Sequence, residues 1–310
     1  MLCGKDDFYD VAIEGESALN KHLWIWVDSP AKRRSAEKDM QTSSILCIDT
    51  EYDSFRYFHD KLCLIQIRAE KRSYLFDPLN GVDLSFLAEP FADPAILKIL
   101  HAGDNDIRLL KRDYGFAFRN VFDTHRAAAI LGCHYLSLST LIHEYLDVDL
   151  EKKKKVQRSE WDKRPLTEDQ LRYAVLDTAY LRPLYEKLAA DIRARGLEKG
   201  AARAFEEITA ATWHEKAFDA GGHKRIKHYS LLTAVQKKRL RGLFRWRFQK
   251  AREMNRAIFM VLSDQELVNL ARVETLTLAG VKAECGFSAE RAARFGKDIL
   301  QILIQQDGLA

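Results

Sequence analysis

The feature that most constrains the fold is a change of hydrophobic pattern part-way along the chain. Between about residues 45 and 191, short apolar runs of β type alternate with helical stretches. The runs are ILCID (45–49), LCLIQI (62–67), SYLFD (73–77) and ILKILH (96–101). Beyond about Gly196 the strand pattern stops, and capping boxes such as Thr233 with Gln236 indicate helices alone. The pattern predicts an α/β domain followed by an all-helical one.

The length and composition fit this division. A chain of 310 residues with 47% hydrophobic side chains can bury the cores of about two domains. We predict an α/β domain over 1–195, a helical connector over 196–228 and a helical bundle over 229–310. The five cysteines include no Cys-x-x-Cys pair, which argues against a zinc site or a disulfide framework. Because no apolar signal segment or membrane-spanning run is present, we expect a cytoplasmic protein without a membrane partner.

Two carboxylates end the first apolar run. Asp49 and Glu51 are one residue apart, and residues i and i+2 of a strand lie on the same face. Two anions this close repel each other unless a cation lies between them, and Mg²⁺ or Mn²⁺ prefers such oxygen ligands. Taken alone, the pair could also mark a strand that leaves the core for a polar loop.

Two further segments carry acids close to expected helix starts. After the fourth apolar run, Asp104 is expected as an N-cap, which puts Asp106 in the first helical turn. In the helix that begins after Thr167, Tyr173 and Asp177 are four residues apart and therefore on one face. Capping could explain the first two acids, and a surface pair could explain the last two residues.

Together these segments resemble the DEDD superfamily of 3′→5′ exonucleases, in its tyrosine branch, and within it the ribonuclease D family. The resemblance covers about residues 43–190. It is carried by Asp49-Thr50-Glu51-Tyr52, Leu64-Ile65-Gln66-Ile67, Phe76-Asp77-Pro78-Leu79, His101-Ala102-Gly103, Asp123-Thr124, Arg158-Ser159-Glu160-Trp161, Arg164-Pro165-Leu166-Thr167 and Tyr173-Ala174 with Asp177. The fold that it implies is of ribonuclease-H type, a mixed sheet flanked by helices.

The resemblance also implies a catalytic site with two divalent cations, Mg²⁺ or Mn²⁺. Asp49 would bridge both ions. Glu51 and Asp177 would hold the ion that activates water, and Asp106 would hold the other, by itself or through water. Tyr173 would orient the attacking water. The products implied are nucleoside 5′-monophosphates, released one at a time from a 3′ end.

The helical part resembles the HRDC module, a small helical bundle. The similarity runs from about Tyr229 to Ile304, through LRGLFRWRFQKAREMNRAIFMVLSDQELVNLAR and AGVKAECGFSAERAARFGKDILQIL. Residues 221–260 hold twelve Lys and Arg but one acid, Glu253, so the net charge of +4 hides a strongly basic segment. We expect this segment to bind nucleic acid, the alternative being a packing domain with a solvated basic face.

The expected nucleic-acid contacts lie near the acids and on the basic segment. Tyr52 could stack on a terminal nucleotide, or its ring could belong to the core. His101 is expected near the site, with a hydrogen-bonding role rather than as a metal ligand. The remaining expected contacts, which could bind phosphates, are Lys154, Lys155, Arg158, Arg241, Arg245 and Lys250.

The predicted function is that of a monomeric 3′→5′ exoribonuclease acting on RNA with a free 3′ end, such as a tRNA precursor. A DNA 3′→5′ exonuclease stays open as an alternative, because the metal chemistry acts on either sugar. A non-catalytic nucleic-acid-binding module is a third hypothesis, against which the complete set of five catalytic residues argues.

Overall fold

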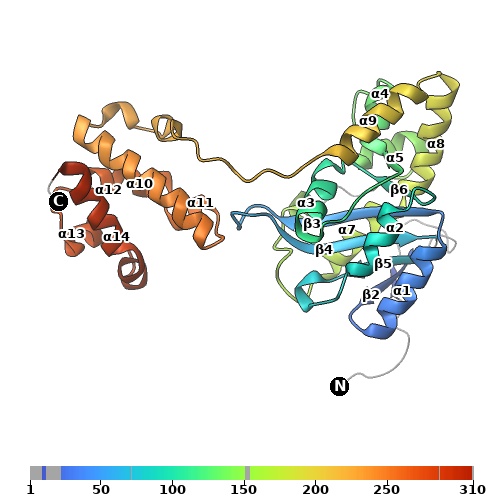
Figure 1. The fold of residues 1–310 in the computed structure, drawn as a ribbon, viewed down its shortest axis with the longest axis horizontal. Coiled ribbons are helices and arrows are strands. Elements are labelled where there is room, and N and C mark those ends of the chain that lie inside the picture. The colour runs from blue at the N-terminus through green and yellow to red at the C-terminus, as the bar shows by residue number, and fades with distance from the viewer. Residues whose placement is uncertain (1–8, 12–21, 71, 151–153, 286, 309–310) are drawn as a thin grey trace. The chain divides into compact units, whose positions relative to one another are not determined.

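The chain forms two compact units (Figure 1). The computed structural model describes residues 9–11, 22–70, 72–150, 154–285 and 287–308. The first unit contains Met1–Asp53 and Lys61–His214, and the second contains Ser54–Asp60 and Glu215–Ala310. The residues expected as a connector, 196–228, are shared between the units: helix α9 (Glu198–Ala210) belongs to the first, and the residues from Glu215 onward belong to the second.

A mixed sheet with the strand order β1-β2-β5-β4-β3-β6-β7 forms the centre of the first unit. Its strands are β1 (Tyr9–Val11), β2 (His22–Val27), β3 (Ile45–Asp53), β4 (Lys61–Ala69), β5 (Arg72–Phe76), β6 (Leu97–Leu100) and β7 (Val121–Asp123). The pairs β2–β5, β3–β6 and β6–β7 are parallel, and the pairs β1–β2, β5–β4 and β4–β3 are antiparallel. The predicted mixed sheet is confirmed, and strands that were not predicted extend it at both edges, β1 and β2 at one and β7 at the other.

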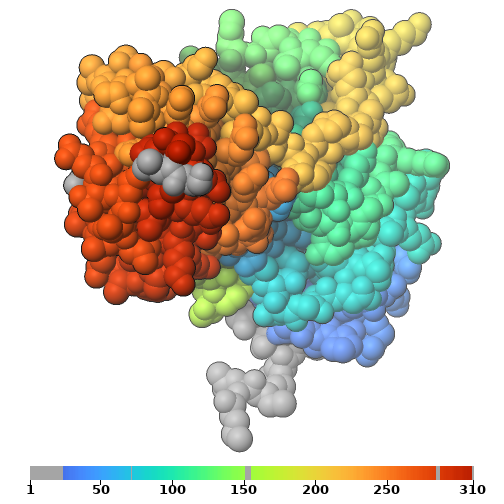
Figure 2. Space-filling view, turned by 60° about the vertical axis from the view of Figure 1, so that its left-hand side comes forward, coloured from blue at the N-terminus to red at the C-terminus, as the bar shows by residue number. Residues whose placement is uncertain are grey.

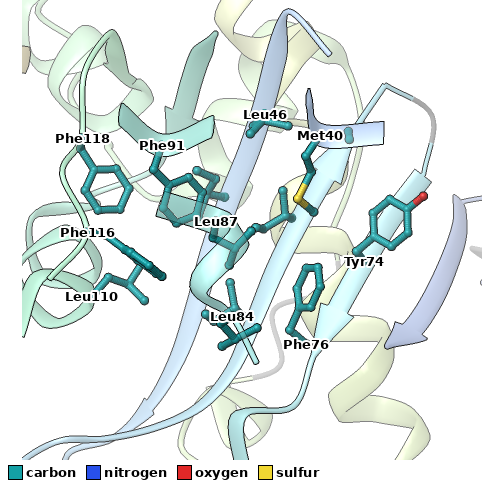
Figure 3. Close-up of a cluster of buried hydrophobic side chains, with 14 of the residues drawn as sticks. Met40, Leu46, Tyr74, Phe76, Leu84, Leu87, Phe91, Leu110, Phe116 and Phe118 are labelled. Carbon is teal, nitrogen blue, oxygen red and sulfur yellow. The ribbon is translucent and has the colours of Figure 1, made fainter. Parts of the chain in front are cut away.

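Helices cover both faces of this sheet. They are α1 (Pro30–Thr42), α2 (Ala88–Ala92), α3 (Asp104–Tyr114), α4 (Thr124–Ile130), α5 (Leu138–Leu146), α6 (Lys154–Gln157), α7 (Glu168–Ala179) and α8 (Leu181–Ala194), besides α9. On one face, Met40 of α1, Phe91 of α2 and Leu110 of α3 pack in one apolar cluster with Leu46 of β3 (Figure 3). On the other face, α4, α5 and α8 pack over Cys47, and α7 packs against β3 and β4.

The alternation along β3 decides which face receives the acids. Leu46 and Ile48 enter the α1–α3 core, whereas Cys47 enters the core beneath α8. Because successive strand residues point to opposite faces, Asp49 and Glu51 follow Cys47 onto the α7 face. Helix α7 begins at the predicted capping box, in which Thr167 and Gln170 bind each other's backbone.

The second unit is helical, as predicted, and its helices share one packed core. In Figure 2 its orange to red residues form one compact body. Its helices are α10 (Ala234–Glu253), α11 (Ile258–Val261), α12 (Asp264–Arg272), α13 (Leu278–Cys285) and α14 (Ala289–Asp307), with short 3₁₀ turns at Gly222–Arg225 and Tyr229–Leu231. The loop 54–60 is part of this bundle, because the buried ring of Phe58 joins its core. Across the described part of both units, no helix is both long enough and apolar enough to span a membrane.

Candidate active site

Three carboxylates converge on the α7 face of the sheet. Asp49 and Glu51 come from β3, and Asp177 comes from the last part of α7. One oxygen of each lies within 4.8 Å of one oxygen of the other two. Glu51 is buried, and Asp49 and Asp177 are half-buried. The structure therefore brings together three of the four acids expected to hold metal.

Burial and mutual repulsion disfavour the charged forms of these three carboxylates. The pKa of Asp49 is raised well above its usual range, first by burial and then by the charges of Asp177 and Asp106. The pKa of Glu51 is raised for the same two reasons, and the charge of Asp49 has the largest effect among its acidic neighbours. Burial also raises the pKa of Asp177 to about 7. Such a cluster gains most from a divalent cation, since the positive charge removes the repulsion and carboxylate oxygens suit hard ions.

Asp106 lies beside the three acids rather than among them. It occupies the first turn of α3, as predicted, and its carboxylate accepts a hydrogen bond from the Thr50 hydroxyl. Burial raises the pKa of Asp106 to about 6, against the lowering effect of that hydrogen bond. Thr50, which the sequence analysis gave no role, thus links Asp106 to the catalytic strand.

The start of α3 differs from the prediction. Asp104 was expected as the N-cap, but the N-cap is Gly103, and Asp104 instead pairs with Arg126 at 2.8 Å. The Gly103 N–H donates to the Asp123 carboxylate at 2.8 Å, and Asp123 also caps α4. A β-carbon on Gly103 would lie 2.6 Å from Cδ2 of Leu100. Only glycine fits this close approach, which sets the position of the first turn of α3.

Tyr173 is placed next to the carboxylates by the helical period. It lies one turn before Asp177, and its hydroxyl forms a hydrogen bond that lowers the pKa of that carboxyl. Burial, followed by the charges of Asp177 and Glu51, raises the pKa of Tyr173 itself. The phenol therefore stays protonated, so that it can act as a hydrogen-bond donor in the site.

A buried ion pair holds the segment that leads into α7. The Arg164 guanidinium binds both oxygens of Asp77, at 2.6 and 2.7 Å, and the Asp77 side chain is fully buried. Arg164 also donates to the backbone oxygens of Cys63 and Trp161, each at 2.7 Å. Both residues belong to motifs that carry the resemblance, but neither was predicted to have a role. The signal was present in the motifs, but nothing local showed that residues 87 positions apart are paired.

A cavity of about 950 Å³ opens beside the carboxylates within the first unit. Its walls include Asp49, Glu51, Tyr173 and Asp177, together with His101, His125, Leu136, Leu138, Gln157 and Arg172. The acids thus lie in a recess that mixes apolar and polar walls, as small-molecule and nucleotide sites do.

His101 lines this cavity, and its ring forms hydrogen bonds, as predicted. Its Nδ1 lies 2.9 Å from the Thr124 hydroxyl oxygen, and its ring also bonds the backbone of Leu136. Burial and the neighbouring His125 lower the pKa of His101 to about 4, so the ring is neutral at pH 7. These bonds attach the Leu136 segment, which forms another wall of the cavity, to the sheet.

The surroundings of Tyr52 favour the hypothesis that its ring belongs to the core. Its half-buried ring packs against the α1–α3 core, and its hydroxyl lies 3.5 Å from the Asp113 carboxylate. Stacking of Tyr52 on a terminal nucleotide stays a prediction.

The expected phosphate contacts differ in their exposure. Lys155 and Arg158, in and after α6, are exposed, and the side chain of Lys154 lies outside the described residues. On α10, Arg241 and Arg245 are exposed, whereas Lys250 is half-buried and pairs with Glu253 and Asp298. Binding of nucleic acid by each of these side chains stays a prediction.

Two arginines of the basic segment stabilise the bundle itself. Arg239 is buried and binds Asp307 at 2.7 Å, and Arg247 is buried and binds Asp264 at 2.8 Å. Their charges are therefore largely compensated inside the second unit. The number of basic residues in 221–260 overstates the positive charge that the surface offers to a ligand.

Comparisons with known proteins assign the family. Residues 24–193 match the 3′-5′ exonuclease domain, and residues 236–303 match the HRDC domain. Ribonuclease D of Desulfotalea psychrophila is 32% identical over 256 residues, which cover 82% of this chain and 68% of that protein. The chain belongs to the 3′-5′ exonuclease family. These two matches confirm the predicted fold class and the expected HRDC bundle of this 3′-5′ exonuclease.

Two further relatives show how far the similarity extends. The exosome complex component 10 homolog of Drosophila melanogaster is 31% identical over 268 residues, covering 84% of this 3′-5′ exonuclease chain. The chain spans only 29% of that protein's length. Among solved structures, Escherichia coli RNase D, described as an exoribonuclease involved in structured RNA processing, is 27% identical with a TM-score of 0.68. That match covers 93% of this chain and 76% of the other.

Proposed function

We propose that this chain is a 3′→5′ exoribonuclease of ribonuclease D type that depends on divalent cations. The observation that carries the proposal is the convergence of Asp49, Glu51 and Asp177 beside the Tyr173 phenol, in a cavity. The similarity to proteins named ribonuclease D supports RNA as the substrate.

The donor set fits hard divalent cations. All its ligand atoms are carboxylate oxygens, and burial and mutual repulsion already raise the pKa values of Asp49 and Glu51. Two Mg²⁺ or Mn²⁺ ions are the proposed occupants. Asp49, Glu51 and Asp177 would hold them, with Asp106 as the further ligand, and the ions would supply Lewis-acid stabilisation of the attacking and leaving oxygens.

The protein's own groups then position the reactants. The neutral phenol of Tyr173, bonded to Asp177, can orient a water molecule for attack on the terminal phosphodiester. The new bond forms between the water oxygen and phosphorus. The bond from phosphorus to the 3′ oxygen of the preceding nucleotide breaks, which releases a nucleoside 5′-monophosphate. Thr50 holds Asp106 in place during this step.

The test is hydrolysis of a single-stranded RNA labelled at its 3′ end. Wild-type protein with Mg²⁺ or Mn²⁺ should release labelled mononucleotides from the start of the reaction, and Asp49→Asn should be inactive. Full activity in excess EDTA, or undiminished activity of Asp49→Asn, would refute the metal-dependent mechanism.

The finer parts of the proposal concern substrate and setting. We propose action on 3′ ends of structured RNA such as tRNA precursors, by a monomer in the cytoplasm. A tRNA precursor with a 3′ extension should be trimmed faster than single-stranded DNA of the same sequence as the extension. Preference for the DNA would favour the alternative DNA exonuclease. Light scattering after gel filtration measures the oligomeric state, and cell fractionation measures the location.

A further inference from the structure

Two exposed aromatic rings lie against each other on the second unit. Phe55 is 67% exposed and Phe259 is 49% exposed, and their ring centroids are 5.0 Å apart with the planes tilted by 48°. Met260, next to Phe259, is exposed as well. Large apolar side chains are normally buried, and a group of them at the surface marks a contact site.

The backbone beneath these rings is firmly held. The Ala257 N–H donates to the Arg56 oxygen at 2.9 Å, and the His59 N–H donates to Oδ1 of Asn255 at 2.9 Å. Phe58 is buried in the bundle core. The loop that carries Phe55 is thus attached to the turn between α10 and α11 at Arg56 and His59, directly after the ring. A rigid, preformed surface loses little entropy when a ligand binds.

Two arginines lie at the end of α10 and in the turn that follows it. Arg252 and Arg256 are exposed, and neither side chain forms an ion pair with any residue that the structure describes. The neighbouring acid, Glu253, is already paired with Lys250 at 3.0 Å. Exposed aromatic rings among unpaired arginines are the combination by which proteins bind single-stranded nucleic acid, with bases on the rings and phosphates on the cations. A second copy of this chain is disfavoured as the ligand, because its own cationic surface would repel this one.

We propose that Phe55 and Phe259 form a stacking platform for an unpaired base of RNA, with Arg252 and Arg256 contacting the flanking phosphates. None of these four residues lines the carboxylate cavity, and Phe55 belongs to the loop 54–60, outside the matched HRDC residues 236–303. The choice of RNA rests on the proposed function.

The test measures the affinity of the full chain for a fluorescently labelled oligouridylate. An Asp49→Asn background prevents cleavage. Replacing both rings, as Phe55→Leu with Phe259→Leu, should weaken binding about tenfold, because base–aromatic stacking contributes ~1–3 kcal/mol per base. Phe55→Trp should retain the affinity. Leu231→Ala is the matched control, since Leu231 is 70% exposed in the same unit and should leave binding unchanged.

An RNA of the same length with abasic sites separates stacking from other effects. The wild type and the double Leu variant should bind this RNA equally, and Arg256→Gln should lower the salt dependence of binding to either RNA. Equal affinity of the double Leu variant and the wild type for oligouridylate would overturn the platform. That result would favour an apolar segment of a protein as the ligand of the rings. Catalysis is measured separately on the wild type, so failure of the exonuclease proposal would be seen independently.

Discussion

The buried pair of Arg164 and Asp77 allows a quantitative prediction for Arg164→Ala. Removing one partner of a buried ion pair costs about 3–5 kcal/mol, because the other charge is left uncompensated. Asp77 would keep hydrogen bonds from the Leu79 N–H at 2.9 Å and from the Asn80 amide at 2.8 Å. Since the Arg164 side chain is also 21% exposed, we expect the lower end of the range, about 3 kcal/mol. That corresponds to a change of roughly 150-fold in the folding equilibrium of the first unit.

The assay is urea unfolding of the full chain, with the free energy of unfolding compared between variants. Arg126→Ala is the matched control, because the Arg126–Asp104 pair is exposed (38% and 43%) and should contribute less than about 1 kcal/mol. Replacing both members of the buried pair, as Asp77→Leu with Arg164→Met, should cost less than Arg164→Ala alone. If Arg164→Ala costs no more than Arg126→Ala, the reasoning about the buried pair is wrong.

Three other predictions follow from the site and the bundle. Gly103→Ala should lower the free energy of unfolding in urea by about 1–3 kcal/mol and reduce exonuclease activity, because the new β-carbon would lie 2.6 Å from Cδ2 of Leu100 and displace α3. Unchanged stability and activity would contradict this. Tyr173→Phe should lower kcat by about 10²-fold with little effect on KM for RNA, and an unchanged kcat would exclude the phenol from positioning water. The Arg239 guanidinium holds the pKa of Asp307 below its usual range. The Arg239–Asp307 pair therefore stabilises the folded bundle at neutral pH, and this stabilisation is lost as the pH falls through the depressed pKa, below about 4. The melting temperatures of the wild type and Asp307→Asn should converge as the pH decreases.

Much of the site could be predicted because its parts are local patterns. The period of two in β3 places Asp49 and Glu51 on one face, and the capping box at Thr167 sets where α7 begins. The helical period then places Tyr173 and Asp177 on one side of α7. Each of these statements depends only on residues close together in the chain, and the structure agrees with each of them.

Other features could not be predicted because distant residues decide them. Aspartate is a common N-cap residue, but the carboxylate of Asp104 is bound instead by Arg126, 22 positions away. No local pattern shows that Phe58, in the loop after β3, would enter the core of the helical bundle. The burial of Arg239 depends in the same way on Asp307, 68 positions along the chain.

The sequence by itself determined the kinds of element, the chemistry of the donors and the family to which they point. Periodicity and capping depend on steric and hydrogen-bonding preferences within a few residues. Only the tertiary structure decided which acids meet, since packing of α7 on β3 brings Asp177 to Asp49 and Glu51 and leaves Asp106 beside them on Thr50. It also decided which arginines of the basic segment are exposed, because burial depends on contacts that no local pattern contains.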